Sequence, residues 1–121
     1  MAIILFDTNI LLDIILHRPQ AEAAYDSVAS ALLRGDDIYI SANSVTDTFY
    51  VVRKAAASRQ TAVEAVQTIL SFMKIADVTG ADIKAAAELN MPDFEDAVAA
   101  AVALRLGAER IITGNVRDFA N

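Results

Sequence analysis

Short apolar runs alternate with longer stretches of helical character along the whole chain, and this alternation constrains the fold most. Two of the runs, IILF and RIIT, are apolar almost throughout, which is typical of strands covered on both faces of a sheet. Strands separated by helices need crossover connections, and these make neighbouring strands parallel. The sequence therefore predicts an α/β fold, a three-layer α/β/α sandwich around a parallel sheet of four strands, with five strands as the alternative.

Turn-forming and capping residues set the expected ends of the helices. Pro19 is expected in the first turn of one helix, because its fixed φ suits that position. Gly107 is expected just after the last helix, because glycine tolerates the left-handed conformation that ends many helices. We expect strands at 3–6, 38–40, 74–78 and 110–113, and helices at 8–16, 19–34, 43–57, 61–73, 81–89 and 92–107. The run Ala97–Ala103 has two equally good explanations, close packing of small side chains and high helix propensity.

Length and composition exclude several classes of protein. A chain of 121 residues that is 55% hydrophobic suits one compact domain spanning residues 1–121. It has no cysteine, which excludes disulfides and cysteine zinc sites, and its one histidine, His17, excludes multi-histidine metal sites. The opening MAIILFDTN is not a secretory signal, and no apolar stretch approaches the roughly 20 residues of a membrane span. We therefore expect a soluble, cytoplasmic protein without membrane association.

The net charge of −6 argues against a broad basic surface for nucleic acid. The argument weakens if some carboxylates belong to a metal site, because a divalent cation offsets two charges and can itself contact a phosphate. Arg53, Lys54 and Arg117 are candidates for phosphate contact, although a solvated charged face is the more common explanation of such residues.

Polar residues follow the expected strands at their carboxyl ends, where open α/β sheets bind ligands. Right-handed connections bring the start of helix 92–107 to the same side of the sheet. The residues concerned are Asp7, Thr8 and Asn9 after the first strand, Ser41, Asn43, Ser44 and Asp47 after the second, Thr113, Asn115 and Asp118 after the fourth, and Asp93 and Asp96 at the helix start. The sequence thus predicts a cluster of carboxylates at one edge of the sheet.

Asp7 and Asp96 stand in unusual places for carboxylates. Asp96 shares a helix face with Asp93 and is followed by the apolar AVAAAVAL, while Asp7 ends an apolar strand. Two like charges about 4 Å apart repel by roughly 4 kcal/mol at an effective dielectric constant near 20, so such a cluster requires protonation or a bound cation. Oxygen ligands suit Mg²⁺ or Mn²⁺, which can activate water for displacement at a phosphodiester.

Most of these residues also have a simpler, structural explanation. Asp7, Thr8 and Asn9 favour helix caps, and Asp93 suits capping as well as it suits metal binding. Asp47 has a solvated surface carboxylate as its alternative. We interpret Ser41 and Ser44 as caps, Glu95 as solvent-facing, His17 as a loop residue, Asn115 as a site or turn residue, and Asp118 as a supporting or turn residue.

Four segments carry a resemblance to a known family. FDTNILLD, SANSVTD, DFEDAVAAAVA and IITGNVRDF, in this order, resemble the PIN domain, and among its members bacterial proteins such as the toxin subunits of VapBC-type toxin–antitoxin pairs. The resemblance implies a ribonuclease that depends on Mg²⁺ or Mn²⁺ and hydrolyses RNA phosphodiester bonds. It also implies a small antitoxin partner that covers the site, and a homodimer.

The same resemblance implies roles for individual residues. Asp47 stands where the family usually has Glu, and Asn115 stands where many members have Asp. The implied roles are catalysis by Asp7, Asp47, Asp96 and Asn115, metal binding by Asp7, Asp96 and Asp93, and support from Thr8, Asn9, Thr113 and Asp118.

Two other functions compete with this one. A PIN fold with departures at Asp47 and Asn115 could bind RNA or a protein partner without cleavage. An aspartate-nucleophile phosphatase also has an Asp after its first strand, but that chemistry needs a second acid where Asn9 stands. The chain ends soon after Phe119, where family members commonly continue with another strand and helix, so a C-terminally truncated domain is one expectation.

Overall fold

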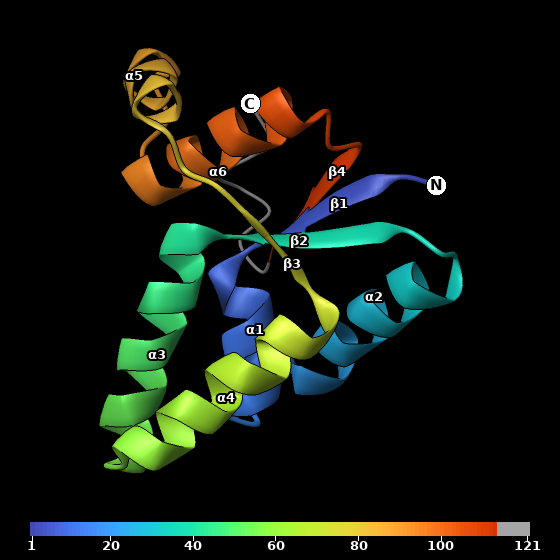
Figure 1. The fold of residues 1–121 in the computed structure, drawn as a ribbon, viewed down its shortest axis with the longest axis vertical. Coiled ribbons are helices and arrows are strands. Elements are labelled where there is room, and N and C mark those ends of the chain that lie inside the picture. Colours follow the sequence, from blue (N-terminus) through green and yellow to red (C-terminus); the bar gives the residue numbers. More distant parts are fainter. Residues whose placement is uncertain (114–121) are drawn as a thin grey trace.

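The computed structural model describes residues 1–113, which form a parallel sheet with helices on both faces (Figure 1). The strands are β1 (Ile3–Phe6), β2 (Asp37–Ser41), β3 (Lys74–Ala76) and β4 (Arg110–Ile112). They lie in the order β3-β2-β1-β4, and every neighbouring pair is parallel. The predicted α/β class is confirmed, and within these residues the sheet has four strands.

The helices lie within two residues of their expected bounds, which is the usual uncertainty at helix ends. They are α1 (Thr8–Ile15), α2 (Ala21–Leu33), α3 (Ala42–Ala56), α4 (Arg59–Phe72), α5 (Gly80–Glu88) and α6 (Phe94–Leu106). The prediction for Pro19 is wrong, because α2 begins only at Ala21 and Gln20 has a non-helical backbone with φ −90° and ψ 8°. Across the described part of the chain, no helix has both the length and the apolar character needed to cross a membrane.

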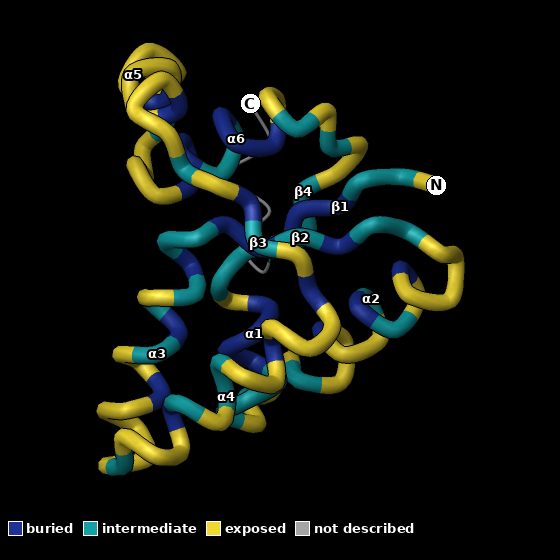
Figure 2. Tube along the Cα trace, in the orientation of Figure 1, coloured by how far each residue is buried: buried dark blue, intermediate teal, exposed yellow. Residues whose placement is uncertain are grey.

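The side chains of β1 alternate between two cores, one on each face of the sheet. Ile4 and Phe6 pack with apolar residues of α1, α2 and α4, whereas Leu5 packs with the alanines and valines of α6. Figure 2 shows the buried residues concentrated where the helices face the strands. Ala97, Ala101 and other small residues of α6 are buried in this second core, which supports the packing explanation of the alanine-rich run. The predicted three layers are therefore present.

The order of the strands leaves Asp7 at the position where the direction of the chain across the sheet reverses. The chain moves outward from β1 to β2 and β3, with α1 to α4 on one side, and then returns through α5 and α6 to β4 on the other side of β1 (Figure 1). The backbone N–H of Asp7 donates to the carbonyl oxygen of Ile112 at 2.9 Å, which ties the ends of β1 and β4 together. Ligands of open α/β sheets bind at such reversal points.

Candidate active site

A cleft of about 390 Å³ lies beyond the carboxyl end of β1. Its walls come from the start of α1, the middle of α3 and the start of α6, so three separate stretches of sequence contribute. The lining residues are Asp7, Thr8, Asn9, Leu12, Asp47, Tyr50, Val51, Asp93, Glu95 and Asp96. The structure thus brings together every described residue that the sequence nominated for catalysis or metal binding.

Asp7 is held by a hydrogen bond to each of its carboxylate oxygens. The backbone N–H of Thr8 donates to Oδ1 at 2.9 Å, and the hydroxyl of Thr113 donates to Oδ2 at 3.0 Å. Burial raises the pKa of Asp7 above its ordinary value, the hydrogen bonds from Thr113, Thr8 and the Asn9 backbone oppose this, and the negative charge of Asp93 adds to the rise. Asp7 is therefore the N-cap of α1, and both its burial and the charge of Asp93 disfavour its ionised form in the cleft.

Asp93 and Asp96 enter the cleft from the first turn of α6. Asp93 is the N-cap of this helix, and its Oδ1 accepts a hydrogen bond from the backbone N–H of Asp96 at 3.1 Å. Asp96 is buried, with only 8% of its surface exposed, although it lines the cleft. The capping explanation of Asp93 is confirmed, and its place in the cleft leaves a metal-binding role available to it.

Glu95 is a member of the cleft that sequence reasoning assigned to solvent. The residue is exposed, but its pKa is raised first by the negative charge of Asp47 and further by burial, Asp93 and Asp7. Because α3 and α6 face each other across the cleft, Glu95 lies within the electrostatic reach of Asp47. No spacing rule within one helix could have predicted this pairing between two helices far apart in the sequence.

Tyr50 and Val51 were also missed, and here the sequence did contain a signal. They lie three and four residues after Asp47 on α3, so all three share one helix face. Since Asp47 is predicted to lie in the site, a spacing of three and four residues on a helix would also have placed Tyr50 and Val51 there.

Ser41 and Ser44 do not cap α3 through their side chains. Ser41 occupies the N-cap position, but its buried hydroxyl pairs with the hydroxyl of Ser44 at 2.9 Å and makes no capping hydrogen bond. The hydroxyl of Thr48 donates to the carbonyl oxygen of Ser44 at 2.7 Å. The prediction of a cap is confirmed for the position of Ser41 and wrong for Ser44, which lies inside α3 and pairs with the Ser41 hydroxyl instead.

Three nominated residues lie outside the described part of the chain. They are Asn115, Arg117 and Asp118.

The donor chemistry of the cleft fits a hard divalent cation. Every charged side chain in it is a carboxylate, and mutual repulsion contributes to the raised pKa of both Asp7 and Glu95. Within residues 1–113, no group of three or more acidic or histidine side chains is arranged to hold a metal ion by itself. This arrangement suits a cation such as Mg²⁺, which is often held by one or two carboxylates and keeps several waters.

Comparisons with known proteins agree with the fold. The PIN domain family model matches residues 3–117. VapC20 of Mycobacterium tuberculosis, described as a toxin that cleaves the sarcin–ricin loop, has a TM-score of 0.79 and 17% identity, with 97% of this chain and 93% of that chain covered. A chain of Rickettsia felis VapBC2, solved with a promoter DNA fragment bound, has a TM-score of 0.76 and 20% identity, with 95% of this chain and 89% of that chain covered.

A third structure is more similar in sequence. It is a toxin–antitoxin complex from Klebsiella pneumoniae, with a TM-score of 0.70 and 25% identity, covering 97% of this chain and 90% of that one. No curated protein sequence matches the chain. The family match covers nearly the whole sequence, and the parallel sheet flanked by helices agrees with the fold predicted from the sequence. The chain therefore belongs to the PIN domain family.

Proposed function

We propose that this protein is a Mg²⁺- or Mn²⁺-dependent endoribonuclease that hydrolyses RNA phosphodiester bonds, and that it is the toxin of a toxin–antitoxin pair. One observation carries the proposal: carboxylates from three separate elements line one cleft, and their burial and mutual repulsion raise the pKa of Asp7 and Glu95. Such an arrangement costs stability, and a bound cation would offset this cost. Groups with shifted pKa values are common at functional sites for this reason.

Each residue of the cleft has a role in this proposal. Asp7 and Asp96 would hold the metal directly, Asp93 would complete or orient the metal site, and Asp47 would bind through water because its side chain is short. When bound, the metal supplies an activated water and offsets the charge that develops on the phosphate. Thr8 and Thr113 orient Asp7 through their hydrogen bonds. The proposed catalytic role of Asn115 and supporting role of Asp118 lie outside the described residues.

Isosteric variants test the catalytic assignment. Asp7→Asn and Asp96→Asn keep the shape of each side chain and remove its charge, so we expect at least a hundredfold loss of Mn²⁺-dependent cleavage of generic RNA. Asp26→Asn is the matched control, because Asp26 is exposed on α2 and does not line the cleft. Equal cleavage by the wild type and Asp7→Asn would remove the catalytic assignment.

A PIN-fold module that binds without cleaving is the second candidate. The observations in its favour are the two departures from the family pattern, Asp47 where the family usually has Glu and Asn115 where many members have Asp. Calorimetric titration with Mn²⁺ separates the two candidates. Heat from a single site that is absent in Asp7→Asn supports the nuclease, whereas no heat with the wild type supports the binding module.

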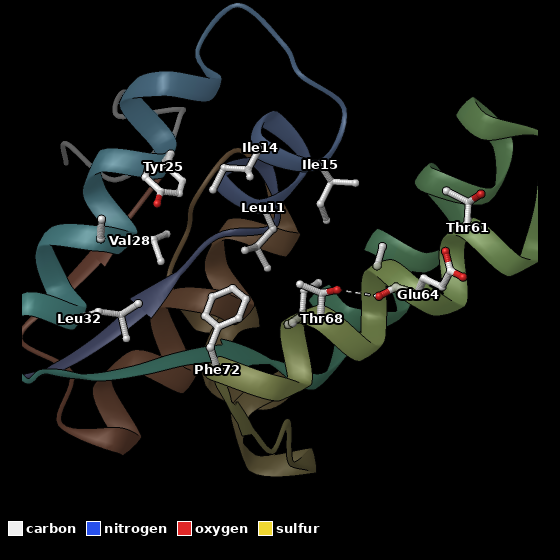
Figure 3. A pocket seen from close by; sticks show the side chains of 13 residues that line it. Leu11, Ile14, Ile15, Tyr25, Val28, Leu32, Thr61, Glu64, Thr68 and Phe72 are labelled. Atoms are coloured by element: carbon white, nitrogen blue, oxygen red, sulfur yellow. Dashed lines mark hydrogen bonds between the residues drawn. The ribbon is translucent and has the colours of Figure 1, made fainter.

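An apolar groove between α1, α2 and α4 supports an antitoxin partner. Figure 3 shows Leu11, Ile14, Val28, Leu32 and Phe72 directed into this groove, whose volume is about 560 Å³. Leu32 remains 48% exposed, and Tyr25 at the same groove is 61% exposed. Large exposed apolar surface of this kind marks sites of protein contact. Since two of the similar structures, those from Rickettsia felis and Klebsiella pneumoniae, are toxin–antitoxin complexes, we propose that an apolar segment of a small antitoxin occupies the groove. The homodimer stays a prediction.

A further inference from the structure

A second pocket lies beside the acidic cleft, and its charge is of the opposite sign. It has a volume of about 450 Å³ and is lined by Tyr50, Arg53, Lys54, Ala57, Ser58 and Arg59. We call it the cationic pocket. Ala57 adopts the left-handed conformation, with φ 52°, and so reverses the chain between α3 and α4. This reversal brings the last turn of α3 and the first residue of α4 together, at the end of the helix pair that lies away from the sheet (Figure 1).

The three cations of this pocket have no carboxylate partner within residues 1–113. By contrast, Arg18, Arg34, Lys74 and Arg105 are each paired with an aspartate. Lys84 and Arg110 also form no ion pair within the described residues, but neither lines a pocket with other cations. In a chain with a net charge of −6, three such cations in one pocket are therefore distinctive. These exposed side chains are therefore available to an anion from outside this part of the molecule.

Helix electrostatics explains two of these cations but not the third. Arg53 and Lys54 lie in the last turn of α3, where the helix dipole favours positive charge. Arg59 is the first residue of α4, where the dipole disfavours positive charge. The position of Arg59 therefore costs free energy in the free protein, and a bound anion would remove this cost.

Tyr50 connects the cationic pocket to the acidic cleft, since it lines both. Tyr50 is 59% exposed, and its ring lies edge-on against the ring of Phe49, with 5.2 Å between the ring centroids. An exposed aromatic side chain of this kind can stack on a nucleobase. The acidic cleft, an aromatic platform and a cationic pocket thus follow one another along α3.

We infer that the cationic pocket binds backbone phosphates of single-stranded RNA on one side of the bond that the acidic cleft cleaves, with Tyr50 stacking on an intervening base. The inference rests on the proposed nuclease function. An acidic cleft repels the polyanionic RNA backbone, so cations outside the cleft must supply the affinity for RNA. The cationic pocket would supply it.

The experiment measures binding in the absence of cleavage. A short, labelled, single-stranded RNA is titrated into the full chain carrying Asp7→Asn, and its fluorescence anisotropy is followed at several salt concentrations. Arg53→Gln, Lys54→Gln and Arg59→Gln are then combined in the same background. We expect the affinity for RNA to fall at least tenfold, and the slope of log affinity against log salt to become shallower by about 2, since each phosphate contact contributes roughly 0.7 for single strands.

Two further variants test the assignment to particular side chains. Tyr50→Ala should weaken binding about tenfold while leaving the salt slope unchanged, because a stacking contact releases no counterions. Lys84→Gln on α5 removes an exposed lysine that lies outside both pockets, and should leave affinity within twofold. An unchanged affinity and salt slope in the triple variant would overturn the inference.

Cleavage by the otherwise wild-type chain separates this inference from the proposed function. If the triple variant raises KM for RNA about tenfold with little change in kcat, both stand. If the wild type cleaves RNA and the triple variant has an unchanged KM, the pocket has no role and the nuclease remains. If the wild type does not cleave RNA but binds it with a salt slope that the triple variant loses, the nuclease fails and the pocket remains.

Discussion

The hydroxyl of Thr113 donates a hydrogen bond of 3.0 Å to Oδ2 of Asp7, although the two residues are 106 positions apart in the chain. Asp7 follows β1 and Thr113 follows β4, and these two strands are parallel neighbours. The other oxygen of Asp7 is held by the Thr8 backbone N–H. The Asp7 carboxylate is therefore oriented by two residues, Thr8 near the start of the chain and Thr113 at the end of its described part.

Thr113→Val removes this hydrogen bond while keeping the shape of the side chain. The bond lowers the pKa of Asp7, so its loss should raise that pKa further and move the acidic limb of the pH–rate profile to higher pH. We expect RNA cleavage at neutral pH to fall about tenfold, since a charged hydrogen bond is worth roughly 1.5–3 kcal/mol. Thr113→Ser retains the hydroxyl and should restore both the rate and the profile. A Val variant with an unchanged pH profile would show that Thr113 does not act through Asp7.

The raised pKa of Asp7 predicts a pH dependence of stability in metal-free protein. Since the folded chain holds this proton more tightly than the unfolded chain, the stabilisation is complete below the unfolded pKa of 3.8 and is lost as pH rises through the folded pKa. Relative to Asp7→Asn, the wild type should therefore lose free energy of unfolding as pH rises from about 3.8 towards neutrality. The lowered pKa values of Asp36 and Asp82 act in the opposite direction, but they cancel in this comparison.

Thermal unfolding in EDTA at a series of pH values measures this difference. Added Mn²⁺ should raise the Tm of the wild type at neutral pH more than that of Asp7→Asn, because a cation bound to the folded state offsets the repulsion. Parallel pH curves for the two proteins would contradict the prediction.

Two substitutions at Asp93 separate capping from metal binding. Asp93→Asn keeps a side-chain acceptor for the Asp96 N–H, so stability should change little, whereas Asp93→Ala should lose about 1 kcal/mol of unfolding free energy. If Asp93 also takes part in metal binding, both variants need several times more Mn²⁺ for half-maximal cleavage. Denaturant unfolding and a Mn²⁺ titration of activity give the two measurements. A normal Mn²⁺ requirement in Asp93→Asn would restrict this residue to capping.

Leu32→Glu tests the apolar groove as the antitoxin site. Because Leu32 is exposed in the groove and absent from the acidic cleft, its replacement should leave the Tm and RNA cleavage of the isolated protein nearly unchanged. We expect the buried charge to weaken binding of the antitoxin by at least a hundredfold, measured by calorimetry with a short purified protein that is encoded beside this one and is first shown to bind the wild type. Leu104→Glu on α6 is the control, since Leu104 is 74% exposed and lies outside the groove. Equal binding by both variants would place the antitoxin elsewhere.

Local features of this protein were predictable from the sequence. The alternation of apolar strands and helices, the cap at Asp93 and the left-handed C-cap at Gly107 depend on residues a few positions apart. Asp7 and Asp96 were recognisable because each is a carboxylate that continues an apolar pattern. Such features depend on interactions between residues that are close in the sequence, so the sequence alone is enough to predict them.

The relations across the cleft were decided only by the tertiary structure. The order β3-β2-β1-β4 makes Thr113 a partner of Asp7, and the facing of α3 and α6 sets Glu95 against Asp47. The turn at Ala57 likewise adds Arg59 to the two cations of α3. Hydrogen bonds and charge interactions depend on distance through space, and the packing of the helices on the sheet sets those distances, not the separation of the residues along the chain.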